Sequence, residues 1–309
     1  MQGGLRQMSV FWILIYGFLR ILQANFNKQT SAFMISKWWF YRYGAYFEFA
    51  AAFFSFVYVC FLGFNNINGI TIICSLITAA CFAGELITSL EAMKRAPLVL
   101  CNICSMGGGI VFVSIIAIYF FQEPMTLLQW LGVVIFFLAV YFLSDNNTEN
   151  RQNVQINKKT GLILILNFFI NGVCGVVGKY FAVKVANGNA PLYSFTTYLF
   201  SSLFFALLLL DYIKKHKSTT AEPVTLKALV LPKKLYIYGA ALGATCSTIV
   251  ILSTILSRTI PVVILNTVPS VISIIGCLII GTLLFHEKIT TKKTIGVILG
   301  ITSLFMIVR

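Results

Sequence analysis

The amino-acid sequence predicts an all-α membrane protein in which ten transmembrane helices form two inverted five-helix repeats. Three observations support this fold class: an apolar composition, ten apolar segments of membrane-spanning length and an internal repeat. Of the 309 residues, 59% are hydrophobic and only 10% are charged, whereas about 25% are charged in a typical soluble domain. Because such a chain cannot cover a water-soluble surface, we expect lipid to be its main solvent.

The ten apolar segments follow one another along the chain, and a helix needs about 20 residues to cross a bilayer. They cover residues 8–27, 38–62, 68–92, 97–121, 127–144, 160–183, 190–213, 234–257, 260–285 and 293–308. Polar breaks separate them, the longest at residues 145–159 and 214–234. The first segment contains Arg20 and no small-residue cleavage pattern follows it, so we expect a retained helix rather than a signal peptide.

An internal repeat is clearest when residues 97–132 are compared with residues 261–296, which lie 164 positions further along the chain. The matches that carry weight are Asn102 with Asn266, Glu123 with Glu287, Thr126 with Thr290 and Gly132 with Gly296. They predict one repeat in residues 1–157 and a second in residues 158–309. Because each repeat has an odd number of helices, the second would enter the membrane from the opposite side. Inverted repeats are typical of secondary transporters, whose substrate site lies near the midplane between the repeats.

These features resemble the drug/metabolite transporter superfamily, and most closely its EamA-like branch. The resemblance covers nearly the whole chain and is most specific in Glu-Pro-Met-Thr-Leu-Leu-Gln-Trp-Leu-Gly, residues 123–132. It implies a secondary-active transporter that carries a small metabolite or drug-like solute by alternating access and that could be coupled to protons. It also implies a central cavity lined by the first four helices of each repeat, with the fifth helix at the periphery.

Four charged side chains inside the apolar segments are candidates for a substrate or coupling pathway: Arg20, Glu48, Glu85 and Lys179. A charge at the bilayer centre costs about 2.5–3.5 kcal/mol on insertion scales, so it normally faces a cavity or a partner. Desolvation penalises the charged form of a carboxyl, which makes Glu48 and Glu85 candidate proton carriers. The alternatives are buried structural pairing and, for Arg20, extension to the lipid headgroups.

Uncharged polar residues add to the candidate pathway. Asn102 and Asn266 could form two walls of one cavity or join helices by hydrogen bonds, and Tyr198 could contribute to the lining. A Glu between two helices can accept backbone N–H bonds or complement the positive start of the next helix. We therefore interpret the remaining repeat-related residues as structural: Glu123, Thr126, Gly132, Glu287, Thr290 and Gly296.

Other classes of protein lack sequence support. All eight cysteines fall in apolar segments, as small packing residues do, and the Cys101–Cys104 pair has no second pair or nearby His. No nucleotide-binding motif and no catalytic constellation is found, so we expect no enzyme, no cofactor, no metal and no nucleic acid. A flippase for a lipid-linked group remains the alternative function, and an intramembrane enzyme is disfavoured. The expected partners are a small-molecule substrate, protons as an option and the lipid bilayer, with monomer and homodimer both open.

Membrane orientation is the point on which two arguments conflict. Most of the 23 Lys and Arg residues fall in the odd-numbered loops, which are the first, third, fifth, seventh and ninth connections between the apolar segments. Loops rich in Lys and Arg are cytoplasmic. This distribution places both termini outside, whereas the family resemblance implies cytoplasmic termini. The composition, rich in Ile, Lys, Asn and Phe, favours a bacterial plasma membrane as the location of this multi-pass protein.

Overall fold

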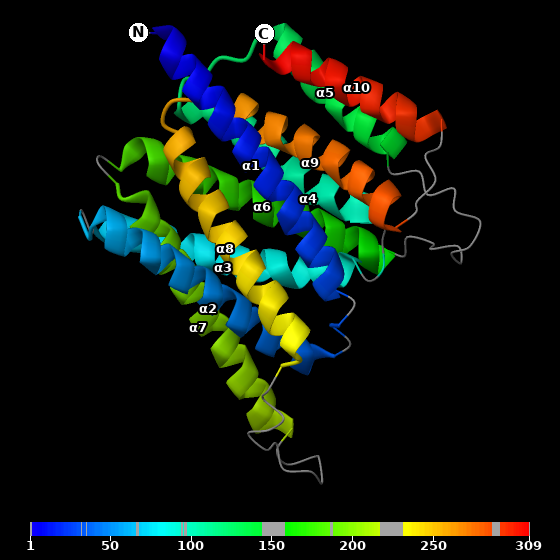
Figure 1. Cartoon of the computed structure of the whole chain (residues 1–309). Helices are drawn as coiled ribbons and strands as arrows, with labels where there is room; N and C mark the ends of the chain where they lie inside the picture. The colour runs from blue at the N-terminus through cyan, green and yellow to red at the C-terminus, as the bar shows by residue number, and fades with distance from the viewer. Residues whose placement is uncertain are drawn as a thin grey trace.

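The structure is a computed structural model, and it is all-helical over the residues that it describes. These are residues 2–31, 33–34, 36–65, 68–93, 95, 98–143, 158–185, 188–216, 231–285 and 291–308. They form ten helices (Figure 1): α1 Gln2–Ser31, α2 Lys37–Leu62, α3 Gly69–Met93, α4 Leu98–Phe120, α5 Leu127–Leu143, α6 Lys158–Lys184, α7 Ala190–His216, α8 Lys233–Leu256, α9 Val262–Phe285 and α10 Thr291–Val308. Each predicted apolar segment therefore corresponds to one helix.

Five helices in the described part of the chain are long and apolar enough to cross a membrane: α2, α3, α6, α7 and α8. Their outward faces expose large apolar side chains, such as Phe61 at 84% and Leu207 at 66%. Soluble monomers rarely expose contiguous apolar surface on this scale. The fold is therefore that of a multi-pass membrane protein. The ten-span arrangement goes beyond this count and stays a prediction.

Local sequence sets where individual helices begin and end. Ser36 caps α2 by accepting a hydrogen bond from the Trp39 backbone N–H, and Gly63 ends that helix at φ 90°, which a glycine adopts without strain. Before α5, the Thr126 hydroxyl accepts from the Gln129 N–H at 3.3 Å and the Gln129 side chain accepts from the Thr126 N–H at 3.0 Å. This reciprocal pair is a capping box.

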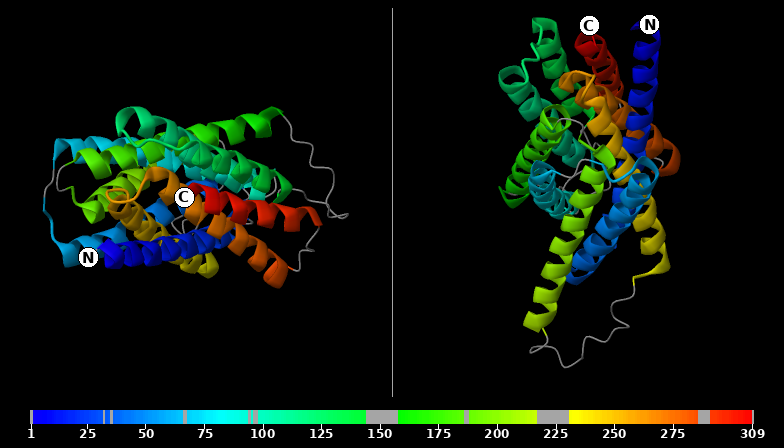
Figure 2. Two further views of the ribbon diagram at one scale, coloured as in Figure 1. Left: turned by 90° about the horizontal axis from the view of Figure 1, so that it is seen from above. Right: turned by 90° about the vertical axis from the view of Figure 1, so that its left-hand side faces the viewer.

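The helices pack in a regular pattern of pairs. Helix α2 packs against α7 and α5 against α10, while α4 packs against α6 and α1 against α9. Helix α3 packs against α6 and α7, as α8 does against α1 and α2. We then exchange each of the first five helices with its counterpart among the last five, α1 with α6 and so on to α5 with α10. This exchange leaves each pairing unchanged or turns it into another pairing of the same set. Helices α5 and α10 lie side by side at one edge of the bundle, and both termini lie at the same end (Figures 1 and 2).

Glycines allow several helices to approach closely, as in other membrane bundles. A Cβ on Gly108 of α4 would lie 1.9 Å from the Phe168 carbonyl oxygen of α6. One on Gly132 of α5 would lie 2.6 Å from Ile307 of α10, which gives this repeat-related glycine the expected structural role. Its counterpart Gly296 is buried in α10. Gly132 therefore serves the packing of α5 against α10.

Candidate functional site

A central cavity of about 200 Å³ lies inside the bundle. Residues of α1 to α4 and of α6 to α9 line it, and no described residue of α5 or α10 does. This is the arrangement that the family resemblance implies. The polar lining includes the side chains Arg20, Gln23, Asn27, Glu48, Glu85, Asn171, Lys179 and Asn266. The cavity therefore collects eight of the charged and amide side chains that the apolar segments contain.

The two ends of the cavity differ in exposure. We call the end at which α1 begins and α8 ends the terminus end, and the other the far end. Near the terminus end, the lining residues Lys179, Ser257 and Leu265 are 3%, 8% and 2% exposed. Near the far end, Gln23 and Ser105 are partly exposed. These three lining residues near the terminus end are thus more buried than Gln23 and Ser105 near the far end.

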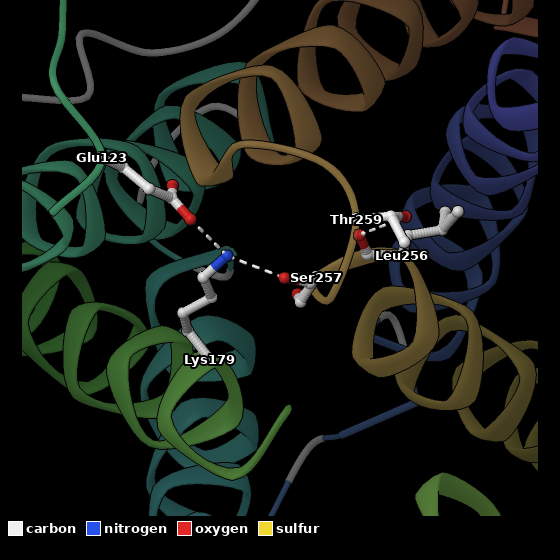
Figure 3. Close-up of polar contacts among 5 residues, drawn as sticks. All are labelled: Glu123, Lys179, Leu256, Ser257 and Thr259. Carbon is white, nitrogen blue, oxygen red and sulfur yellow. Dashed lines mark hydrogen bonds and ion pairs between the residues drawn. The ribbon is translucent and has the colours of Figure 1, made fainter. Parts of the chain in front are cut away.

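Three residues lie together near the terminus end of the cavity: Glu123, Lys179 and Ser257. We call them the closing cluster (Figure 3). The Lys179 Nζ lies 2.7 Å from Glu123 Oε1 and donates a second 2.7 Å hydrogen bond to the Ser257 carbonyl oxygen. Lys179 belongs to α6, Glu123 lies between α4 and α5, and Ser257 follows α8 directly. The cluster thereby joins the predicted first repeat to the predicted second repeat.

The local backbone explains why Glu123 reaches Lys179. Gln122 adopts a positive φ of 53°, and the Glu123 N–H donates to the Ala117 carbonyl at 3.2 Å, so the chain turns sharply after α4. The capping box of Thr126 and Gln129 then begins α5. Glu123 thus forms an ion pair with Lys179 of α6, a contact that the sequence did not indicate.

Aromatic packing and further hydrogen bonds reinforce the terminus end. The rings of Phe181 and Tyr193 stack at a centroid distance of 4.2 Å, and the Tyr193 hydroxyl lies 2.7 Å from that of Thr78. The Arg258 guanidinium also hydrogen-bonds the Gly188 carbonyl oxygen. The connections after α6 and α8 are therefore joined beside the closing cluster.

Arg20 and Glu85 face the cavity from α1 and α3. The Arg20 guanidinium donates to the Tyr16 hydroxyl at 2.9 Å and to Gln23 Oε1 at 3.1 Å, so its head group is held inside the bundle. The Ser105 hydroxyl donates to Glu85 Oε1 at 3.4 Å, and Arg20 and Glu85 lie within electrostatic range of each other. This cation and this anion share the wall nearer the far end.

Glu48 has a different environment from Glu85. It is 1% exposed and lines the cavity from α2, and its Oε2 has no hydrogen-bond partner among the described residues. Tyr198 of α7 is 3% exposed, lines the same cavity and packs on the Phe82 ring at 5.2 Å. Both residues therefore line the cavity, and their part in a transport pathway stays a prediction.

Asn266 takes both of the roles considered for it. It lines the cavity, and its side-chain amide donates a 2.9 Å hydrogen bond to the Gly109 carbonyl oxygen of α4. The side chain of its counterpart Asn102, together with Glu287 and Thr290, lies outside the described residues. Within the described part of the chain, no group of His, Cys, Asp and Glu side chains is placed to hold a metal ion.

Some cavity residues were not selected by the sequence reasoning. Gln23 and Asn27 join Tyr16 and Arg20 on the lining, and these four residues of α1 follow one another at spacings of three or four. Side chains at such spacings share one face of a helix. A search for polar residues at helical spacing within each apolar segment would have found this face.

Comparison with known proteins supports the fold alone. No protein-family model and no curated protein matches the chain. Its fold is similar to that of a protein of known crystal structure, with a TM-score of 0.70 and 10% sequence identity over 95% of both chains. At this identity the likeness extends to the arrangement of the helices and not to a substrate.

Proposed function

We propose that this protein is a secondary-active transporter of the EamA-like branch of the drug/metabolite transporter superfamily. It carries a small metabolite or drug-like solute by alternating access. The observation that carries this proposal is a central polar cavity lined by both proposed repeats, with an ion pair that joins the two repeats near its terminus end. A channel would need both ends open at once, whereas a carrier exposes its site to one side at a time.

The helix packing supports two inverted repeats that together span the membrane ten times. The main pairings are unchanged when the first five helices are exchanged with the last five, as expected for repeats in residues 1–157 and 158–309. Helices α2 and α7, which are counterparts, pack against each other, as do α5 and α10. Such an arrangement has two equivalent ways to open, one toward each side of the membrane.

Transport then requires the closing cluster to separate while the far end closes. Lys179 is almost fully buried, so the Glu123 carboxylate and the Ser257 carbonyl replace the water that its ammonium group would otherwise bind. Opening the terminus end lets water replace these contacts. Because the ion pair joins the two proposed repeats, a relative movement of the repeats would break it.

Ligand screening followed by transport assays tests the proposal. Amino acids, nucleosides, sugars and cations are screened by thermal shift, because a ligand that binds the folded state stabilises it. Stabilising ligands are then tested for uptake into proteoliposomes, and lipid scrambling is measured in the same vesicles. We expect uptake without scrambling. Scrambling without uptake would instead favour the flippase for a lipid-linked group.

A further inference from the structure

We propose that Glu48 is the proton-binding site of this protein, where one proton is taken up from the cavity and released to it. The inference deepens the proposed transport function by naming the coupling ion and the residue that binds it. The reaction is the protonation of the Glu48 carboxylate to the neutral carboxylic acid. The observation behind this assignment is a buried carboxyl that lines the cavity and has no cationic partner among the described residues.

The position of Glu48 gives it access to the cavity and little access to anything else. The residue is 1% exposed, yet it contributes to the cavity lining. Its helix α2 packs mainly against α7 and α8, both from the other proposed repeat. Its Oε2 atom is buried and has no hydrogen-bond partner among the described residues. A carboxylate left this way in an apolar bundle is costly, and taking up a proton removes the charge.

The groups that face Glu48 do not offer a compensating cation. These are Tyr43 of its own helix, Glu85 of α3, Tyr198 of α7 and Cys246 of α8. The set contains a second carboxyl group, that of Glu85, and no Lys or Arg side chain. The buried hydroxyl of Ser201, which faces Glu48 from α7, likewise has no hydrogen-bond partner among the described residues. It can donate a hydrogen bond to the Glu48 carboxylate or accept one from the protonated acid.

Glu85 does not meet the same conditions, although it lies in the same cavity. It is partly exposed, it accepts a hydrogen bond from Ser105 and it lies within electrostatic range of Arg20. Each of these contacts favours the charged form. The structure thus separates the two carboxyls that the sequence left equivalent: Glu85 belongs with the cation Arg20, and Glu48 holds the exchangeable proton.

Coupling follows from the location of Glu48 between the proposed repeats. While the cavity is open toward one side, Glu48 can exchange its proton with water from that side. Movement of α2 relative to α7 and α8 would carry the proton site with the substrate cavity to the other side. A pH gradient could therefore drive accumulation of the substrate.

Infrared difference spectroscopy during a pH titration tests the site without using transport. In the purified full-length protein, the band of a protonated carboxyl should disappear as pH rises. It should be lost in Glu48→Gln and kept in Glu85→Gln. Because Gln mimics the neutral acid, Glu48→Gln is expected to fold, and Glu48→Asp should restore a titrating band. A band that persists in Glu48→Gln, or that does not change with pH in the wild type, would overturn the assignment.

Proteoliposomes test the coupling step separately. Glu48→Gln should lose accumulation driven by a pH gradient, so that the ratio of internal to external ligand falls to about one, while exchange of labelled for unlabelled ligand continues. Asp211→Asn, which changes an exposed carboxylate at the end of α7, serves as the control. Accumulation that follows a sodium gradient, or unchanged accumulation in Glu48→Gln, would refute proton coupling at Glu48. If the wild type exchanges no ligand, the transport proposal fails, whereas the infrared titration still decides whether Glu48 binds a proton.

Discussion

Replacing Glu123 by Gln should open the terminus end of the cavity. The substitution keeps the size of the side chain but removes the carboxylate 2.7 Å from the Lys179 Nζ. Lys179 is 3% exposed and would keep the Ser257 carbonyl as an acceptor. Breaking a fully buried ion pair costs about 3–5 kcal/mol. Because the Glu123 side chain is 26% exposed, we expect roughly 2 kcal/mol here, since water already screens part of the interaction.

This cost falls on the conformation that is closed at the terminus end. About 2 kcal/mol corresponds to a shift of roughly 30-fold in the equilibrium between closed and open conformations. The assay uses a single cysteine at Ser253, a cavity-lining residue of α8, in a variant without the native cysteines. A membrane-impermeant thiol reagent is added from each side in turn. Labelling from the terminus side should rise by about the same factor in Glu123→Gln.

An exposed ion pair provides the matched control. Lys215 and Asp211 are also 2.7 Å apart, but their side chains are 70% and 56% exposed, and such pairs contribute little. Asp211→Asn should therefore leave the labelling unchanged. The exchange of charges in Glu123→Lys with Lys179→Glu should partly restore closure. If Glu123→Gln labels like Asp211→Asn, the ion pair does not hold the terminus end closed and the reasoning is wrong.

Three further predictions concern packing, the cavity wall and orientation. Gly108→Ala should lower the thermal stability in detergent by an amount equivalent to about 1–3 kcal/mol or more, because its Cβ would meet the Phe168 carbonyl. The control Gly161→Ala has open space around its Cβ and should leave the stability unchanged. Equal melting temperatures of the two variants would contradict the close contact. Asn266→Leu should cost about 0.6–2 kcal/mol through loss of the bond to Gly109, and a variant as stable as the wild type would show that this bond contributes nothing. A reporter active only in the cytoplasm should be silent after Arg309 and active near Ser218, since Lys and Arg are concentrated in the odd-numbered loops; the reverse pattern would place both termini in the cytoplasm.

The positions of the helices could largely be predicted from the sequence, because hydropathy reports directly on burial in lipid. The first and last residues of the helices are harder to predict from the sequence. The first apolar segment was expected at 8–27, but α1 continues to Ser31. Its polar last turns bond internally, with Gln29 donating to Asn25 at 3.3 Å and Thr30 to the Phe26 carbonyl at 2.9 Å. Hydropathy does not detect such bonds.

Several of the cavity-lining residues could be selected from the sequence, but their contacts could not. A charge inside an apolar segment indicates that the side chain has a cavity or a partner, and this placed Arg20, Glu48, Glu85 and Lys179 in the pathway. The position of a charge in the sequence does not say which residue is its partner. The pairing of Lys179 with Glu123 depends on how α6 meets the connection between α4 and α5. The difference between Glu48 and Glu85 likewise depends on which side chains surround each carboxyl.

Counterflow in proteoliposomes tests the central claim most directly. Vesicles containing the purified protein are loaded with an unlabelled ligand from the thermal-shift panel and diluted into a trace of the same ligand in labelled form. An alternating-access carrier exchanges one for the other, so labelled ligand should accumulate transiently above its equilibrium level and then leave. Vesicles without protein should show no such accumulation. Labelled ligand that reaches equilibrium without exceeding it would indicate a pore open at both ends and would contradict the account.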